Sequence, residues 1–215
     1  MSTAVIFDMD GTLFDTEAVF QKYWNAIAKE RGIVLPDAFK YEICGTSGEV
    51  MNRIIEKQYR VKDGTEIQRE CKRRVAKELS RGVPLKPGCR EILASLHARG
   101  IPMAIGSSGR RAQIESNLSV SGFTSYFSAI VSGDEVLQGK PAPDIFLLAA
   151  KKLGVRPADC CVFEDSPNGI RAAHAAGMKP ILIPDLMPVT EEIASLTVGV
   201  YKVLTDALEE LVAGD

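Results

Sequence analysis

Two aspartates, Asp8 and Asp10, follow a short apolar run near the start of this 215-residue chain. Residues 4–7 (Ala-Val-Ile-Phe) lead into Asp-Met-Asp and then Gly11-Thr12, which is typical of a buried strand that ends in a turn. Carboxylates at the carboxyl end of a parallel strand point into the crevice where open α/β sheets bind ligands. Because neighbouring carboxylates repel each other unless a cation lies between them, the pair indicates a site for a hard, oxygen-ligated ion such as Mg²⁺.

Two other interpretations of this segment remain open at this point. Asp8, Asp10, Gly11 and Glu17 match positions three, five, six and twelve of a calcium-binding loop. Position one of that loop is then Ile6, which has no ligating side chain, and the residues before it resemble a strand and not a helix. The second alternative is a plain Asp-Gly turn that binds nothing.

Three further polar groups follow later apolar runs: Ser107 with Ser108, Lys140, and Glu164-Asp165. Each has a simple structural explanation. Ser107 can begin a helix, Lys140 can be a solvated loop residue, and Glu164-Asp165 can cap the next helix. Taken separately, those explanations do not say why all of these groups come after strands of the same sheet. Together the groups offer a carboxylate cradle for a metal, hydroxyl and amide donors, and one fixed cation, which is what phosphoryl transfer requires.

The elements that position these groups form an alternating series after Pro84, Pro87 and Gly88 break the chain. Besides the strand at 4–7, the apolar runs predict strands at 101–105, 129–131, 160–163 and 180–183. Helical patterns lie between them and end at Gly100, near Leu118, and at Gly154 and Gly177. This alternation predicts an α/β fold with a doubly wound parallel sheet.

Residues 17–82 interrupt the series with helical periodicity and no strand signal. Apolar stripes recur there at helix spacing, beginning with Phe20, Tyr23, Trp24 and Ile27. We therefore expect two domains, a catalytic core of residues 1–16 and 83–215 and a helical cap of residues 17–82. Two chain crossings join them, and an insertion of this kind can act as a lid.

Composition excludes several classes of function. The net charge of −2 argues against general affinity for nucleic acid or an anionic membrane surface. The sequence has no apolar stretch of membrane-spanning length and no signal-peptide pattern, and its five cysteines form no Cys-x-x-Cys pair. We expect a cytoplasmic protein with buried, reduced thiols and with no nucleic-acid or membrane partner; the sequence leaves its oligomeric state open. With only two histidines, the chemistry falls to carboxylates, hydroxyls and lysine.

In order along the chain, Asp8-Met9-Asp10-Gly11-Thr12, Ser107, Gly139-Lys140-Pro141 and residues 164–169 resemble the four motifs of the haloacid dehalogenase superfamily. Residues 162–177 are most similar to the branch that contains β-phosphoglucomutase and pseudouridine-5′-phosphatase. The resemblance spans the whole chain. It implies a Rossmann-like core with a small inserted helical cap.

The resemblance also implies roles for the leading aspartates. Asp8 would attack phosphorus and become a transient aspartyl phosphate. Asp10 would protonate the leaving oxygen and then deprotonate the water that hydrolyses the intermediate. The chemistry is consistent, because a metal-bound Asp8 stays ionised while the Asp10 side chain, free of the metal, can carry a proton.

The resemblance assigns the binding groups as well. Mg²⁺ would be held by Asp8 and Asp165 and by the backbone carbonyl of Asp10, with Glu164 as a further ligand or a residue that contacts one. The residues that would bind the phosphoryl group are Ser107, Ser108 and Lys140.

These roles predict a Mg²⁺-dependent phosphatase for a small phosphorylated metabolite, either a sugar phosphate or a nucleoside monophosphate. The first alternative is a phosphosugar mutase of the β-phosphoglucomutase type. The mutase has a histidine where this chain has Phe20, and a cap arginine after Gly-x-Ser where residues 45–47 (Gly-Thr-Ser) are followed by Gly48. Both differences favour water as the acceptor. The second alternative is a non-catalytic metal-binding module, against which the presence of every expected catalytic residue counts.

Overall fold

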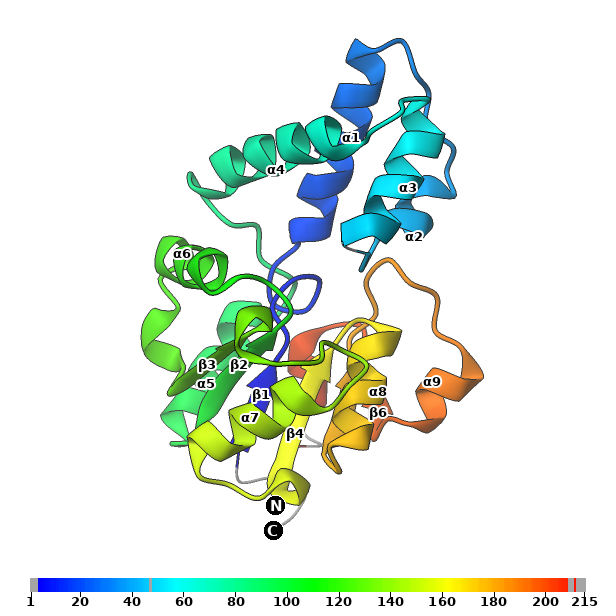
Figure 1. The fold of residues 1–215 in the computed structure, drawn as a ribbon. Helices are drawn as coiled ribbons and strands as arrows, with labels where there is room; N and C mark the ends of the chain where they lie inside the picture. The colour runs from blue at the N-terminus through cyan, green and yellow to red at the C-terminus, as the bar shows by residue number, and fades with distance from the viewer. Residues whose placement is uncertain (1–3, 47, 209–210, 212–215) are drawn as a thin grey trace. The chain divides into compact units, whose positions relative to one another are not determined.

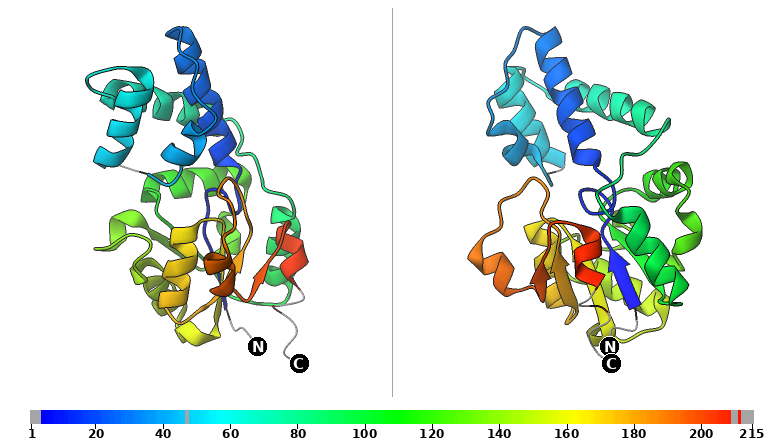
Figure 2. Two further views of the ribbon diagram at one scale, coloured as in Figure 1. Left: turned by 90° about the vertical axis from the view of Figure 1, so that its right-hand side faces the viewer. Right: turned by 180° about the vertical axis from the view of Figure 1, so that it is seen from behind.

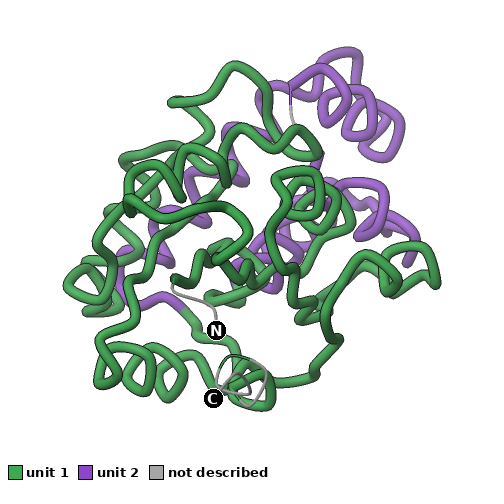
Figure 3. Tube along the Cα trace, turned by 90° about the horizontal axis from the view of Figure 1, so that it is seen from below, with its two compact units in different colours: residues 1–15, 84–215 green, residues 16–83 purple. Residues whose placement is uncertain are grey.

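A computed structural model describes residues 4–46, 48–208 and 211 of the chain. Ser47, part of the cap motif compared above, lies outside the described residues. The chain divides into two compact units, one of residues 1–15 and 84–215 and the other of residues 16–83 (Figure 3). The expected division differs from this one by a single residue at each junction.

The two segments that lead into and out of the insertion are paired within the first unit. The N–H of Asp15 donates to the carbonyl of Pro84 at 2.9 Å, and the N–H of Lys86 donates to the carbonyl of Leu13 at 2.9 Å. The chain therefore leaves the first unit and returns to it at neighbouring points.

The first unit is built on a six-stranded sheet with the order β3-β2-β1-β4-β5-β6 (Figure 1). Every neighbouring pair of strands is parallel. The strands are β1 (Ala4–Phe7), β2 (Met103–Ser107), β3 (Ala129–Ser132), β4 (Cys160–Glu164), β5 (Lys179–Leu182) and β6 (Gly199–Val200). The predicted doubly wound parallel sheet is thereby confirmed. The chain order reverses between β1 and β4, and that switch point is where such sheets bind ligands.

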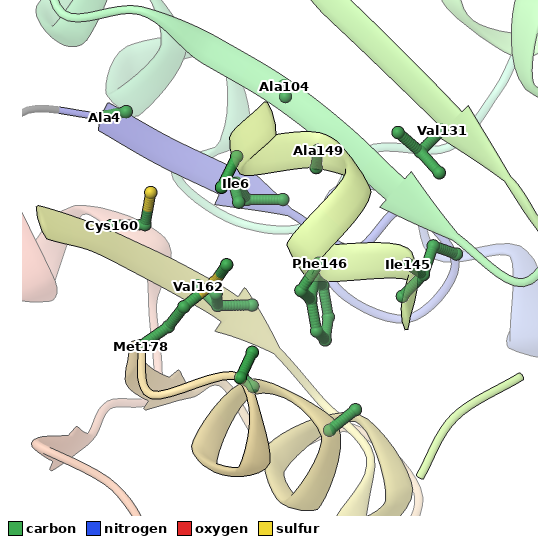
Figure 4. Packing of buried hydrophobic residues seen from close by; sticks show 14 residues of the cluster. Ala4, Ile6, Ala104, Val131, Ile145, Phe146, Ala149, Cys160, Val162 and Met178 are labelled. Carbon is green, nitrogen blue, oxygen red and sulfur yellow. The ribbon is translucent and has the colours of Figure 1, made fainter. Parts of the chain in front are cut away.

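Helices cover both faces of this sheet, which is why its central strands are continuous apolar runs. The helices are α5 (Cys89–Ala98), α6 (Arg111–Ser121), α7 (Asp144–Leu153), α8 (Pro167–Ala175) and α9 (Glu191–Ser195). Figure 1 shows α7 and α8 over one face, and Figure 2, seen from behind, shows α5 over the other. Phe146 and Ala149 of α7 pack against Ile6 of β1 and Ala104 of β2 (Figure 4). On the strands themselves, the rings of Phe7 and Phe163 stack with centroids 4.9 Å apart.

The second unit is helical in its described residues. Its helices are α1 (Thr16–Glu30), α2 (Phe39–Ile43), α3 (Gly48–Tyr59) and α4 (Thr65–Leu79). Trp24, Phe39 and Tyr59 meet edge to face at the centre of a separate apolar core, and the Tyr59 hydroxyl donates to the Trp24 carbonyl at 2.7 Å. Within the described part of the chain, no helix is both long enough and apolar enough to span a membrane.

Candidate active site

Asp8 lies immediately after the central strand β1 and is only 7% exposed. Its N–H donates to the carbonyl of Phe163 on β4 at 2.9 Å, which fixes the position of its backbone. The chain then turns sharply at Gly11, whose φ is +87°. A Cβ at Gly11 would lie 2.5 Å from a carboxylate oxygen of Asp165, so both the backbone conformation and the space favour glycine here.

Lys140 joins two carboxylates at this edge of the sheet. Its Nζ lies 2.5 Å from Oδ1 of Asp8 and 2.6 Å from Oε1 of Glu164, and all three side chains are more than nine-tenths buried. The ammonium also lies 4.8 Å from the ring centre of Phe146. Lys140 is thus a buried ion-pair residue, and the interpretation as a solvated loop lysine is wrong.

Both carboxylate oxygens of Glu164 accept hydrogen bonds. Oε1 accepts from Lys140, while Oε2 accepts from the N–H of Ser166 at 2.8 Å and from its hydroxyl at 2.9 Å. A Cβ at Gly169 would overlap this carboxylate, so glycine is needed there too. The arrangement orients Glu164 toward Lys140.

The residue that caps α8 is Ser166, and not Glu164 or Asp165. Its hydroxyl oxygen accepts from the N–H of Gly169 at 3.1 Å. Sequence reasoning missed this role, although a serine followed by proline at the first helical position is a known helix-start signal.

Asp165 is tied to the loop after β1. Its Oδ1 accepts from the hydroxyl of Thr12 at 3.1 Å, and Thr12 is fully buried. The bond links the loops that follow β1 and β4, the two central strands. Thr12 lies within the first sequence motif, but its position there does not predict this contact with Asp165.

The side chains of Ser107 and Asp10 both lie close to Gly109. The buried Ser107 hydroxyl oxygen accepts from the N–H of Gly109 at 3.1 Å. A Cβ at Gly109 would lie 3.3 Å from that hydroxyl and 3.8 Å from Oδ2 of Asp10, so the two side chains converge on one spot. The helix α6 begins after Arg110 without a side-chain cap, so Ser107 does not cap it. Ser108, in contrast, is exposed.

Burial and charge crowding act on the titration of Asp8 and Lys140. Burial raises the pKa of the Asp8 carboxyl to about 8, although the Lys140 ammonium opposes the rise. The carboxylates of Glu164 and Asp10 add to it by repulsion. Burial alone lowers the pKa of Lys140, but its two carboxylate partners outweigh this and raise that pKa above its usual range.

Asp165 experiences the same crowding. Burial, followed by repulsion from Glu164, Asp8 and Asp185, raises its pKa well above the usual range, against the hydrogen bond from Thr12. Lys140 supplies one positive charge for several carboxylates. A divalent cation beside Asp8 and Asp165 would relieve the remaining repulsion.

The donors at this edge fit Mg²⁺. Among the described residues, no group of three or more His, Cys, Asp or Glu side chains is arranged to hold a metal by side chains alone. The expected ligand set needs fewer, because it combines the carboxylates of Asp8 and Asp165 with the backbone carbonyl of Asp10. Such an all-oxygen set, completed by water, suits a small hard cation. The hydrogen bonds of Glu164 to Lys140 and Ser166 engage both oxygens it could offer.

A second buried ion pair was not foreseen from the sequence. Nζ of Lys86 lies 2.7 Å from Oδ1 of Asp185, with side chains 14% and 10% exposed. Asp185 follows β5, the strand next to β4, while Lys86 belongs to the segment that returns from the insertion. The two residues are 99 positions apart, and no local pattern links them.

This chain is similar in sequence to several known proteins. The model of a family described as haloacid dehalogenase-like hydrolase matches residues 5–183. A Drosophila melanogaster protein named "Probable pseudouridine-5'-phosphatase" is 36% identical over 191 residues, covering 85% of this chain and 82% of the relative. The fructose-1-phosphate phosphatase of Escherichia coli strain K12 is 37% identical over 178 residues, covering 82% and 94%.

Solved structures agree in fold. A haloacid dehalogenase family hydrolase from Deinococcus radiodurans R1, with bound phosphate and sodium, superposes with a TM-score of 0.83 at 29% identity, covering 98% of this chain and 96% of that one. The β-phosphoglucomutase of Clostridium difficile superposes with a TM-score of 0.76 at 24% identity, covering 99% and 96%. At that identity the mutase supports a shared fold and nothing about the reaction.

Proposed function

The chain belongs to the haloacid dehalogenase-like hydrolases, and from this we propose that it is a Mg²⁺-dependent phosphatase that hydrolyses a small phosphorylated metabolite through an aspartyl phosphate. The observation that carries the proposal is the buried Asp8 carboxylate, held by Lys140 at the end of the central strand. The names of the fly and bacterial relatives support a phosphatase, and they favour a sugar phosphate or a nucleoside monophosphate as the substrate.

Asp8 is the proposed nucleophile. Lys140 binds its Oδ1, so Oδ2 is the oxygen that attacks phosphorus. A phosphorus–oxygen bond forms to Asp8 as the bond to the leaving oxygen breaks, and Asp10 supplies the proton which that oxygen needs. Asp10, now a carboxylate, then takes a proton from a water molecule whose oxygen attacks phosphorus. The bond between phosphorus and Asp8 breaks, inorganic phosphate leaves, and the Asp8 carboxylate is restored.

Three groups of this chain stabilise the transferring phosphoryl group in the proposal. The Lys140 ammonium lies beside the attacking carboxylate, the Ser107 hydroxyl converges on the same spot as Asp10, and the backbone at Ser108 supplies further donors. Asp8, Asp165 and the Asp10 carbonyl would hold Mg²⁺, which would supply a Lewis acid that offsets the negative charge of phosphate and carboxylates.

Every residue with a role in this chemistry belongs to the first unit. We assign the second unit the role of the cap domain, which selects the substrate. Its helical core is independent of the sheet, since Trp24, Phe39 and Tyr59 pack against one another.

Phosphate release from a panel of phosphorylated metabolites tests the proposed activity. We expect Mg²⁺ to accelerate hydrolysis of the best sugar phosphate or nucleoside monophosphate by about 10²-fold or more over the same protein in a chelator. Free phosphate is measured before and after Mg²⁺ is restored. If no compound releases phosphate, or if the chelator has no effect, the proposal is wrong.

A phosphosugar mutase of the β-phosphoglucomutase type is the rival function. Two positions of the second unit count against it. Phe20 packs against the apolar core where the mutase has a histidine, and Gly48 begins α3 where an arginine would bind a distal phosphate.

A coupled assay separates the two reactions. With β-glucose 1-phosphate as substrate, we expect free phosphate to form at least as fast as glucose 6-phosphate, because water is the proposed acceptor. Glucose 1,6-bisphosphate should not be needed as an activator. Isomerisation much faster than phosphate release would identify the protein as a mutase.

A further inference from the structure

The Lys86–Asp185 pair holds a buried oxygen that the proposed chemistry does not use. Oδ1 of Asp185 is bound by Lys86 at 2.7 Å, whereas its Oδ2 is buried and has no hydrogen-bond partner among the described residues. The Asp185 side chain is nine-tenths buried. A buried carboxylate oxygen without a partner is costly, so it indicates a group that the protein chain itself does not supply.

The fold places Asp185 at the same edge of the sheet as the proposed cation site. In the register of β4 and β5, Glu164 lies opposite Leu182, and the N–H of Ile183 donates to the Glu164 carbonyl at 2.8 Å. Asp165 and Asp185 therefore follow neighbouring parallel strands at the same edge of the sheet.

Both aspartates are also tied to one short turn after β1. Thr12 donates its hydroxyl to Asp165, and the next residue, Leu13, accepts a hydrogen bond from the backbone of Lys86. Lys86 in turn holds Asp185. Consecutive residues of the turn thus anchor Asp165 and the ion pair.

We propose that Oδ2 of Asp185 accepts a hydrogen bond from a water molecule bound to the cation that Asp165 ligates, which makes Asp185 a positioning residue for that cation. The inference rests on the proposed Mg²⁺ site. Mg²⁺ keeps several of its water ligands in proteins, and those waters need acceptors of fixed position. Lys86 supplies that fixation, because its ammonium holds the other carboxylate oxygen of Asp185 at 2.7 Å.

The substitution Asp185→Asn tests the inference. The Lys86 ammonium can only donate, so the amide oxygen of the new side chain turns toward it and the amide NH₂ faces the bound water. A water bound to a cation is a strong donor and a poor acceptor, because it gives one lone pair to the cation and points its hydrogens away from it. We expect the Mg²⁺ dissociation constant, measured by isothermal titration calorimetry without substrate, to rise about 10- to 100-fold.

The matched control is Asp159→Asn. Asp159 also forms an ion pair, at 2.7 Å with Arg156, but it precedes β4 whereas Asp165 follows it. This variant should bind Mg²⁺ like the wild type. If Asp185→Asn does not fold, the double variant Lys86→Met/Asp185→Leu replaces the pair by apolar side chains, which a buried site commonly tolerates, and the same loss of affinity is expected.

Several outcomes would overturn the inference. If a folded Asp185 variant has a Mg²⁺ dissociation constant within about threefold of the wild-type value, Asp185 does not contact a water bound to the cation. If the variant loses affinity equally for Mg²⁺ and for the less tightly hydrated Ca²⁺, the cause is the long-range charge of Asp185 and not a bound water. If the wild type itself binds no Mg²⁺, both the proposed metal site and this inference fail, whereas an unchanged variant beside a binding wild type rejects the inference alone.

Discussion

Asp8→Asn is expected to lower kcat by about 10³-fold or more while the protein keeps its fold. The amide cannot attack phosphorus as a carboxylate does, and it replaces one anionic ligand of the proposed cation site. The amide oxygen can still accept the hydrogen bond from Lys140, so the packing around the sheet edge is retained. The measurement is kcat for the best substrate of the panel, with the melting temperature as the test of folding.

Asp159→Asn is the control for this loss as well, because it makes the same chemical change before β4 instead of after β1. It should retain the wild-type kcat. A folded Asp8→Asn protein that keeps more than about a tenth of the wild-type kcat, in a preparation free of other phosphatases, would rule out the covalent mechanism. Acid-quenched wild-type enzyme should in turn yield a phosphorylated peptide that contains Asp8.

Asp10→Asn is expected to lower kcat on an alkyl phosphate by about 10²- to 10⁴-fold, the usual contribution of a positioned acid or base. Its backbone carbonyl is unchanged, so Mg²⁺ affinity should stay near that of the wild type. The loss should shrink for an aryl phosphate with an acidic phenol, because that leaving group departs without a proton.

The comparison between the two substrates decides the role of Asp10. The ratio of wild-type to variant kcat is measured for one alkyl and one activated aryl phosphate. Equal ratios would contradict leaving-group protonation by Asp10. A rise in the Mg²⁺ dissociation constant equal to that of Asp8→Asn would instead make the Asp10 side chain a metal ligand.

Much of the sheet could be predicted from the sequence, because strands buried on both faces are continuous apolar runs. The strand at 4–7 has the predicted bounds, whereas β2 begins two residues later than the expected 101–105 and ends two residues later. Gly106-Ser107 has the composition of a turn, but both residues pair with β3 and so belong to the end of the strand. The two-residue β6 and the five-residue α2 are too short to carry a periodic pattern.

The edge of the sheet where the site lies could be predicted as well, because parallel strands present their carboxyl ends together. Which of these side chains pair with one another could not be predicted from the sequence. Lys140 binds one carboxylate 132 positions before it and another 24 positions after it, and no local signal links them. The contact of Thr12 with Asp165 spans 153 positions. Such partners follow only from the register of neighbouring strands.

The pairing of Asp15 with Pro84 has an evolutionary consequence. Since the chain departs from the sheet and rejoins it at adjacent points, the length and sequence of the intervening segment are not constrained by strand order or connectivity. That segment can therefore be exchanged as a unit during evolution. With the proposed roles, divergence there would change which metabolite is accepted, while the residues assigned to the hydrolysis would stay the same. This topology allows one catalytic ancestor to give rise to enzymes of many specificities.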